Sequence, residues 1–231
     1  MPKDYLIVFL KYAEKGKVKT RLAEKMGNEF TLDFYTICAE HVFNICNDLK
    51  SKDITPILFS SEKRNVGNIR KWSGEKFDVH FQEEGELGNK MYEAFKQIFG
   101  LDASKAVIIG TDLPDLSHQI IVEAFNLLDN YDVVLGPAKD GGYYLLGLNK
   151  KQFDESIHQL FNSISWSTNK VLTETIIRID KLKLKYKLLK ELQDIDTEEN
   201  LVNWLKSEKT KDSEIVKEIR KEIEKHGKIK N

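Results

Sequence analysis

Apolar residues in this chain gather into short continuous runs, and stretches with helical spacing separate the runs. The runs are YLIVFL (5–10), TPILFS (55–60), AVII (106–109), DVVLG (132–136) and YYLLGL (143–148). They show little alternation of polar and apolar residues, which is typical of strands covered on both faces, as in parallel sheets flanked by helices. Two further strands are expected at 77–82 and 184–189.

Helical spacing between these runs predicts helices over 28–50, 65–72, 87–99 and 117–128, with Asn28 able to cap the first. Beyond residue 150, helical patterns cover 152–160 and 169–179, and two helices follow Thr197. Strands that alternate with helices favour an α/β fold with a largely parallel sheet. Neither a linker nor a second core is evident, so residues 1–231 are expected to form one domain.

The C-terminal part, 208–231, is expected to be an amphipathic helix extension. Ile215, Ile219 and Ile223 stand at positions i, i+4 and i+8 among many charged residues. Such a narrow apolar stripe either packs on the helix's own domain or forms the surface of a homodimer.

The composition of the chain limits the kinds of partner that it is expected to bind. The chain has 36 Lys and Arg against 37 Asp and Glu, a net charge of −1, so no global field recruits nucleic acid or anionic lipid. No apolar run approaches the roughly 18 to 20 residues that span a bilayer, and the N-terminus lacks a signal-peptide layout. We therefore expect a cytoplasmic protein without nucleic-acid or membrane partners. Cys38 and Cys46 are expected to be reduced core thiols.

A basic loop, KYAEKGKVKTRL (11–22), follows the first expected strand. Lys11, Lys19 and Arg21 belong to a crowd of cations around Gly16, and such a loop can bind phosphate because glycine lets backbone amides approach an anion while Lys and Arg neutralise it. The spacing is neither that of a P-loop nor that of a dinucleotide-binding loop. A solvated lysine-rich turn explains the loop equally well.

The run AVIIGTDLPDL (106–116) raises the question of why a buried strand ends in acid. Ligands of open α/β sheets collect outside the carboxyl ends of the strands. Asp112 is therefore a candidate metal ligand, with Gly110 and Thr111 beside it as candidate substrate-binding residues. Asp115 is expected to cap or brace the loop. The alternative is turn and helix-cap chemistry around Pro114.

A second strand end, GPAKDGGYY (136–144), presents Asp140 beside Gly141 and Gly142. The glycines indicate either a plain hairpin turn or a close approach of backbone to a ligand.

A third acidic loop, LQDIDTEEN (192–200), places Asp194 and Asp196 just before a helix that Asp196 or Thr197 can cap. Beyond capping, one of the two aspartates could share a hard cation with Asp112 over bound phosphates.

These motifs lie in a recognisable order between residues 3 and 205: GKVKTRLA (16–23), ELGNKM (86–91), IGTDLPDL (109–116), VLGPAKDGGYYLLGL (134–148), SWST (165–168) and DIDT (194–197). In this the chain resembles the radical-SAM/selenodomain-associated transferases, often described as arsenosugar-biosynthesis glycosyltransferases, within the nucleotide-diphospho-sugar transferase (GT-A) superfamily. It departs from that family in lacking prolines before Gly16, in Leu113 for a cysteine, and in Glu86 and Lys90 for Asp and Arg.

The resemblance implies a three-layer α/β/α fold with a mixed, mostly parallel central sheet. It also implies a Mg²⁺ or Mn²⁺ ion held by Asp112 together with Asp194 or Asp196. The substrate-binding residues would be Lys11, Lys19, Arg21, Gly110, Thr111, Gly141, Gly142 and Trp166. Asp140 would orient or deprotonate the acceptor.

The function expected on these grounds is that of a metal-dependent glycosyltransferase, which moves a sugar from a nucleotide-activated donor to a small-molecule acceptor. One alternative is a guanylyltransferase-like nucleotidyltransferase that releases pyrophosphate. The other is a catalytically silent nucleotide-binding module. The L-x-G-G-x-x-x-R-M-G loop common in nucleotidyltransferases is absent, which favours sugar transfer, although phospholactate guanylyltransferases lack it too.

Overall fold

A seven-stranded sheet forms the centre of the computed structural model, which describes residues 3–207 and 213–227. Its strands are β1 (Lys3–Leu10), β2 (Ile54–Ser60), β3 (Asp78–Phe81), β4 (Ala103–Ile109), β5 (Val133–Pro137), β6 (Tyr143–Asn149) and β7 (Tyr186–Leu188). All the expected strands are present, each with ends within a few residues of the prediction.

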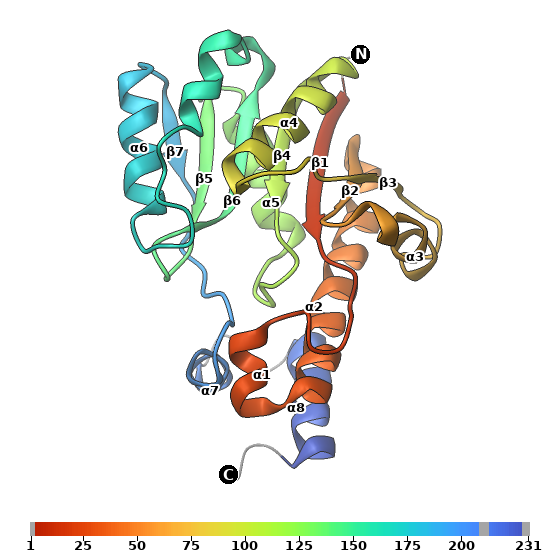
Figure 1. Cartoon of the computed structure of the whole chain (residues 1–231). Helices are drawn as coiled ribbons and strands as arrows, with labels where there is room; N and C mark the ends of the chain where they lie inside the picture. Colours follow the sequence, from red (N-terminus) through yellow and green to blue (C-terminus); the bar gives the residue numbers. More distant parts are fainter. Residues whose placement is uncertain (1–2, 208–212, 228–231) are drawn as a thin grey trace.

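The strand order is β3-β2-β1-β4-β6-β5-β7 (Figure 1). Only β6 runs against its neighbours β4 and β5, while every other neighbouring pair is parallel. Six strands therefore point the same way, and their carboxyl ends share one edge of the sheet. This confirms the mixed, mostly parallel sheet.

Helices cover both faces of the sheet. On one face lie α2 (Asn28–Leu49), α3 (Val66–Trp72) and α5 (His118–Leu127); on the other lie α4 (Leu87–Gly100), the 3-10 segment η4 (Glu155–Leu160) and α6 (Val171–Lys181). Residues alternate between the two cores along β1, since Leu6 and Val8 face the first and Ile7 the second. The predicted three-layer α/β/α arrangement is confirmed. Shorter 3-10 turns are η1 (Lys50–Lys52), η2 (Lys63–Asn65) and η3 (Lys150–Gln152).

A third apolar cluster lies beyond the carboxyl edge of the sheet, and we call it the helical base. It joins α1 (Thr20–Met26), the first half of α2, α7 (Glu198–Lys206) and α8 (Glu214–His226), seen at the bottom of Figure 1. Phe30, Phe34 and Trp204 are its largest fully buried side chains.

The apolar stripe of α8 is buried in the helical base. Ile215, Ile219 and Ile223 are at most 7% exposed, so the stripe packs on its own chain and offers no surface for a homodimer. The parts 208–212 and 228–231 of the expected extension lie outside the described residues. The Asp33 carboxylate of α2 is hydrogen-bonded to Lys225 and His226 of α8, and these bonds hold α8 against α2.

Three local expectations were inaccurate. The loop expected over 11–22 contains the start of α1, whose buried Leu22 and Met26 are held by the helical base. Asn28 is the first residue of α2 rather than its cap, because Gly27 precedes it with a positive φ of 80°. The segment expected as a helix at 152–160 is made of 3-10 turns. Cys38 and Cys46 are buried and unpaired with each other, as expected.

Candidate functional site

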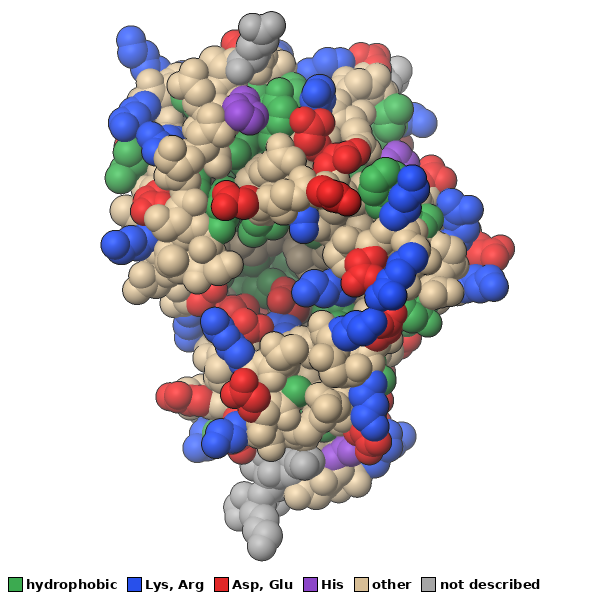
Figure 2. Space-filling view, viewed as in Figure 1, with side chains coloured by type: hydrophobic (Ala, Val, Ile, Leu, Met, Phe, Trp, Pro, Cys, Tyr) green, Lys and Arg blue, Asp and Glu red, His purple; other side chains and the backbone are tan. Residues whose placement is uncertain are grey.

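A cavity of about 690 Å³ lies between the carboxyl edge of the sheet and the helical base. In Figure 2 it is the hollow at the centre of the molecule, with acidic and basic side chains gathered around it. Every predicted site residue except Gly141 lines it: Lys11, Lys19, Arg21, Gly110, Thr111, Asp112, Asp140, Gly142, Trp166, Asp194 and Asp196. Segments more than 180 residues apart in the sequence therefore meet at one cavity, as the common carboxyl edge predicts.

The centre of the site is an ion pair between one lysine and two aspartates. Lys19 Nζ donates to Asp112 Oδ2 at 2.9 Å and to Asp196 Oδ1 at 2.8 Å. The Lys19 side chain is 4% exposed, whereas those of Asp112 and Asp196 are 40% and 43% exposed. The ammonium thus lies beneath the two carboxylates, which face the cavity.

The charges of this group shift one another's proton affinities. Burial alone would lower the pKa of Lys19, but the charges of Asp112 and Asp196 outweigh burial and raise it above its ordinary value. Burial would likewise raise the pKa of Asp112, but Lys19, and more weakly Lys11, hold it below the usual range. Lys19 and Asp112 are therefore both charged at neutral pH.

The backbone at Lys19 is unusual. It directly precedes α1 and has φ 45° and ψ 49°, in the left-handed region that costs a residue with a Cβ about 1 kcal/mol. The strain is sustained by what surrounds it, because α1 is fixed by Leu22 and Met26 in the helical base and the Lys19 side chain is fixed by two carboxylates.

Asp140 and Asp194 form a second acidic pair in the cavity. After β7 the chain continues along β5: Leu189 N donates to Leu135 O at 2.8 Å, and Lys139 N donates to Leu192 O at 3.0 Å. This pairing carries Asp194 to the turn that holds Asp140. Burial, and then the charges of Asp140 and Asp196, raise the pKa of Asp194 above its usual range.

Sequence reasoning missed Tyr35, which links two of the strand ends. From α2 its hydroxyl accepts from Lys11 N at 3.0 Å, donates to Lys11 O at 3.1 Å and lies 3.2 Å from Thr111 Oγ1. Burial raises the pKa of Tyr35 to about 12. The side chain therefore fixes the end of β1 against the loop after β4. A tyrosine on the apolar face of a helix gives no hint of this in the sequence.

Asp115 braces the loop, as expected, from outside the cavity. Its Oδ1 accepts from Trp204 Nε1 at 2.8 Å. Trp204 is 2% exposed and belongs to α7, so the bond connects the helical base to the loop that carries Asp112. The neighbouring Ile195 is fully buried in the same cluster and anchors the segment between Asp194 and Asp196.

In the Asp194–Thr197 segment, one residue caps α7 and its neighbour faces the cavity. Thr197 Oγ1 accepts from Asn200 N at 3.2 Å, and Asn200 Oδ1 accepts in return from Thr197 N at 3.2 Å, a reciprocal cap of α7. Because Thr197 caps the helix, Asp196 is left to pair with Lys19.

Two motif glycines are explained by packing. Gly141 has φ 90°, and a Cβ there would lie 2.2 Å from Asn169 O; the close approach is to the chain's own backbone, so Gly141 shapes the turn from outside the cavity. A Cβ on Gly88 would lie 2.7 Å from Trp166 Cζ2, so this glycine lets the Trp166 ring pack on α4 at the cavity wall. Asp140 Oδ1 accepts from Gly142 N at 2.8 Å, which closes the same turn.

The donor set fits a hard divalent cation. Asp112, Asp140, Asp194 and Asp196 all line one cavity, and carboxylate oxygens are what Mg²⁺ and Mn²⁺ prefer. The Lys19 ammonium already stands between two of them as a cation. Burial is the main cause of the raised pKa of Asp194, and the charges of Asp140 and Asp196 add to it.

Among residues 3–207 and 213–227, one other group of side chains has donor atoms close enough together to hold a metal ion. Asp33, Glu222 and His226 have donor atoms within 4.8 Å of one another, on α2 and α8. Lys225 Nζ lies 3.1 Å from Asp33 Oδ2 and 2.7 Å from Glu222 Oε2, so an ammonium already pairs with both carboxylates of this group.

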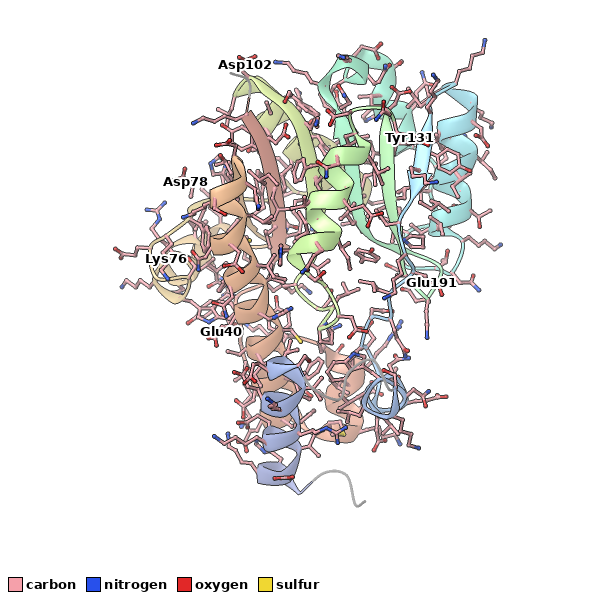
Figure 3. All side chains as sticks on the ribbon, turned by 180° about the vertical axis from the view of Figure 1, so that it is seen from behind. Glu40, Lys76, Asp78, Asp102, Tyr131 and Glu191 are labelled. Carbon is pink, nitrogen blue, oxygen red and sulfur yellow. The ribbon has the colours of Figure 1, made fainter. Side chains whose placement is uncertain are left out.

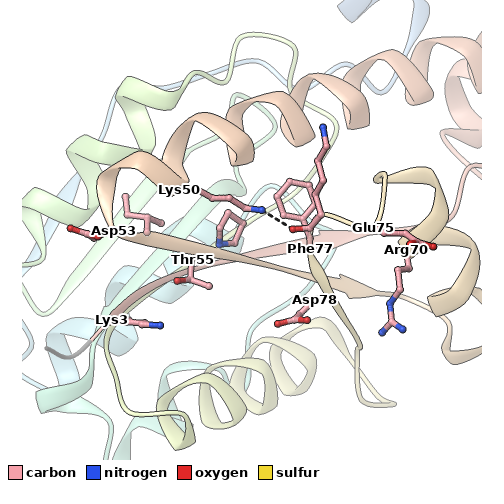
Figure 4. A pocket seen from close by; sticks show the side chains of 11 residues that line it. Lys3, Lys50, Asp53, Thr55, Arg70, Glu75, Phe77 and Asp78 are labelled. Atoms are coloured by element: carbon pink, nitrogen blue, oxygen red, sulfur yellow. Dashed lines mark hydrogen bonds between the residues drawn. The ribbon is translucent and has the colours of Figure 1, made fainter.

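A larger hollow, of about 820 Å³, lies at the opposite edge of the sheet (Figure 4). Lys50 Nζ donates there to Lys76 O at 2.7 Å and lies over the Phe77 ring. Acids and bases alternate around it, and none of the predicted site residues lines it. We therefore place the candidate site at the carboxyl edge.

Comparison with models of protein families shows the family of the chain. Residues 44–168, more than half of the chain, match the model of a family described as an uncharacterized protein conserved in bacteria, DUF2064. The chain belongs to the DUF2064 family. No helix among the described residues is long and apolar enough to cross a membrane.

One curated relative and two solved structures show which kinds of protein the chain is similar to. The chain is 25% identical over 222 residues, 93% of this chain and 91% of the relative, to 2-phospho-L-lactate guanylyltransferase of Methanocaldococcus vulcanius. A provisionally named nucleotide-diphospho-sugar transferase from Desulfovibrio desulfuricans G20 superposes with a TM-score of 0.87 at 26% identity, over 98% of this chain and 99% of that one. A 4-diphosphocytidyl-2C-methyl-D-erythritol synthase from Anaerococcus prevotii shares the fold, with a TM-score of 0.53 at 14% identity over 87% and 96% of the two chains. The relatives are transferases, and the superfamily is that of the nucleotide-diphospho-sugar transferases.

Proposed function

We propose that this DUF2064 protein is a metal-dependent nucleotidyltransferase, which transfers a nucleoside monophosphate from a nucleoside triphosphate to a small anionic acceptor. The observation that carries the proposal is the convergence of the cations of the first loop and the acids of three later loops on one cavity. The similarity to one 2-phospho-L-lactate guanylyltransferase over nine tenths of both chains supports nucleotidyl rather than sugar transfer.

In this reaction an acceptor oxygen attacks the α-phosphorus, and the bond from that phosphorus to the bridging oxygen breaks. Pyrophosphate leaves with the electron pair, so negative charge grows on the leaving oxygens. Lys11, Lys19 and Arg21 line the cavity on the side of β1 and would neutralise this charge. A bound Mg²⁺ or Mn²⁺ would add charge stabilisation at the phosphate oxygens, and Asp112 with Asp196 and Asp194 would hold it.

The acceptor would bind near the turn between β5 and β6. Asp140, Tyr143, Trp166 and Lys90 line this side of the cavity. Lys90 supplies a positive charge that suits an anionic acceptor, and the two rings supply apolar surface. Asp140 would orient the attacking group, because its carboxylate is held by Gly142 N.

Sugar transfer remains a second candidate. It is favoured by the likeness, over almost the whole of both chains, to the provisionally named nucleotide-diphospho-sugar transferase. In that reaction the acceptor oxygen would attack the anomeric carbon of a nucleotide sugar, and a nucleoside diphosphate would leave. The same cations would stabilise that leaving group. The resemblance to arsenosugar-type glycosyltransferases stays a prediction of this second candidate.

A donor panel tests the proposal. The protein with Mn²⁺ or Mg²⁺ is screened for melting shifts against nucleoside triphosphates and nucleotide sugars. Turnover with small phosphorylated and hydroxylated acids is then followed by pyrophosphate release. We expect a shift with a triphosphate and release of pyrophosphate. A shift with nucleotide sugars and release of nucleoside diphosphate would select the second candidate, and a shift without turnover would indicate a binding module.

The Asp112→Asn variant tests the assigned site. It should abolish metal-dependent turnover while the ligand-free protein still folds, as checked by circular dichroism, although with a lower melting temperature because Lys19 loses one of its two partners. Asp78→Asn is the matched control, because Asp78 is an exposed aspartate at the opposite edge of the sheet, labelled in Figure 3. Normal turnover in Asp112→Asn would refute the assignment.

A further inference from the structure

The position of Lys19 limits what the two central carboxylates can bind. Its Nζ lies 2.9 Å from Asp112 Oδ2 and 2.8 Å from Asp196 Oδ1, so it stands between them. A Mg²⁺ ion needs oxygens at about 2.0–2.1 Å. A cation bound by both carboxylates would therefore occupy the space of the ammonium and repel its charge.

From this geometry we propose that the Lys19 ammonium occupies the metal site between Asp112 and Asp196 and keeps a divalent ion out. The ammonium leaves this site when it binds a phosphate of the donor. The inference deepens the proposed function and rests on it. In the ligand-free protein Lys19 pairs with both Asp112 and Asp196. When the donor enters, its phosphates offer Lys19 a new partner, and the two carboxylates become free for the divalent ion. Metal and nucleotide then bind cooperatively, and the metal alone binds weakly.

Two features of the chain make such a movement feasible. The Asp112 and Asp196 side chains are about two-fifths exposed to the cavity, so they stay hydrated when Lys19 leaves. The left-handed backbone of Lys19 is relaxed if the residue rotates, because a residue with a Cβ is strained in this region. Thr20 follows at the first turn of α1 and stays anchored through Leu22.

The test measures Mn²⁺ affinity in the absence of nucleotide, by titration with detection of free Mn²⁺ by electron paramagnetic resonance. We expect Lys19→Met to bind Mn²⁺ at least about tenfold more tightly than the wild type, because it removes the positive charge that occupies the metal site. Lys15→Met is the matched control. It removes the same charge from the same loop, but Lys15 is exposed and paired with Glu29. The Mn²⁺ affinity of this variant should therefore differ from that of the wild type by less than about threefold.

Folding of each variant is checked by circular dichroism and melting. Lys19→Gln serves if the methionine variant does not fold, since it keeps a hydrogen-bond donor without the charge. Equal Mn²⁺ affinity in Lys19→Met and the wild type, or an equal gain in Lys15→Met, would overturn the blocking role and leave the proposed function intact. Failure of every variant to bind Mn²⁺ would also overturn it, and unchanged turnover in EDTA would then remove the metal from the proposed function as well.

Discussion

The bond between Trp204 and Asp115 should control both stability and the shape of the site. It is a direct side-chain link between α7 in the helical base and the loop that carries Asp112. Trp204→Phe keeps an aromatic ring in the cluster and removes the indole N–H. A hydrogen bond to a charged acceptor contributes about 1.5–3 kcal/mol, and the smaller ring loses about 1 kcal/mol of apolar burial.

We therefore expect Trp204→Phe to lower the free energy of unfolding by about 2.5–4 kcal/mol, measured by urea denaturation. Combined with Asp115→Ala in a double-mutant cycle, the coupling should be about 1–2 kcal/mol, because Asp115 is partly solvated. The variant should also bind the donor and metal more weakly, because Asp112 is then held less firmly relative to Lys19 and Asp196.

Trp72→Phe is the control for this substitution. Trp72 Nε1 donates to Glu40 Oε1 at 2.9 Å, the same kind of bond, but between α3 and α2, and neither residue lines the cavity; Glu40 is labelled on α2 in Figure 3. That bond is exposed, so its loss should cost less than about 1 kcal/mol and leave ligand affinity unchanged. A coupling near zero between Trp204 and Asp115, or an equal loss of affinity in Trp72→Phe, would refute the reasoning.

Two further predictions follow from other contacts of the site. Gly88→Ala should push Trp166 from the cavity wall, since the new Cβ would lie 2.7 Å from its ring, and we expect a loss of about 1–3 kcal/mol in urea denaturation together with weaker acceptor binding; unchanged stability would contradict the packing. Asp194→Asn should raise the melting temperature of the ligand-free protein at pH 7 and have little effect below about pH 4. The sign follows because the folded-state pKa of Asp194 is raised, so this carboxyl destabilises the fold increasingly as pH rises through that pKa; an equal effect at both pH values would contradict it.

The strands and the position of the site were predictable because they depend on local pattern and on a general property of parallel sheets. The runs at 5–10 and 106–109 became the adjacent strands β1 and β4, and the residues after them, Lys11 and Asp112, meet at the same edge. The helix α1 was not predictable in this way. Seven residues with Leu22 and Met26 as their buried apolar side chains are too short to be stable alone, and α1 is held by the helical base.

The pairing within the site depends on distances that no local pattern contains. Lys19 lies 93 residues from Asp112 and 177 from Asp196 in the sequence, and the contact exists because α1, the loop after β4 and the start of α7 are all fixed by the same helical base. Sequence reasoning predicted a phosphate site at Lys19 and a metal site at the aspartates, and treated the two sets as separate. In the structure the lysine is the cation of the aspartates. On the proposed function these residues would later bind an anion and a metal. In the ligand-free protein their opposite charges pair with one another, which lowers the cost of keeping both sets in one cavity.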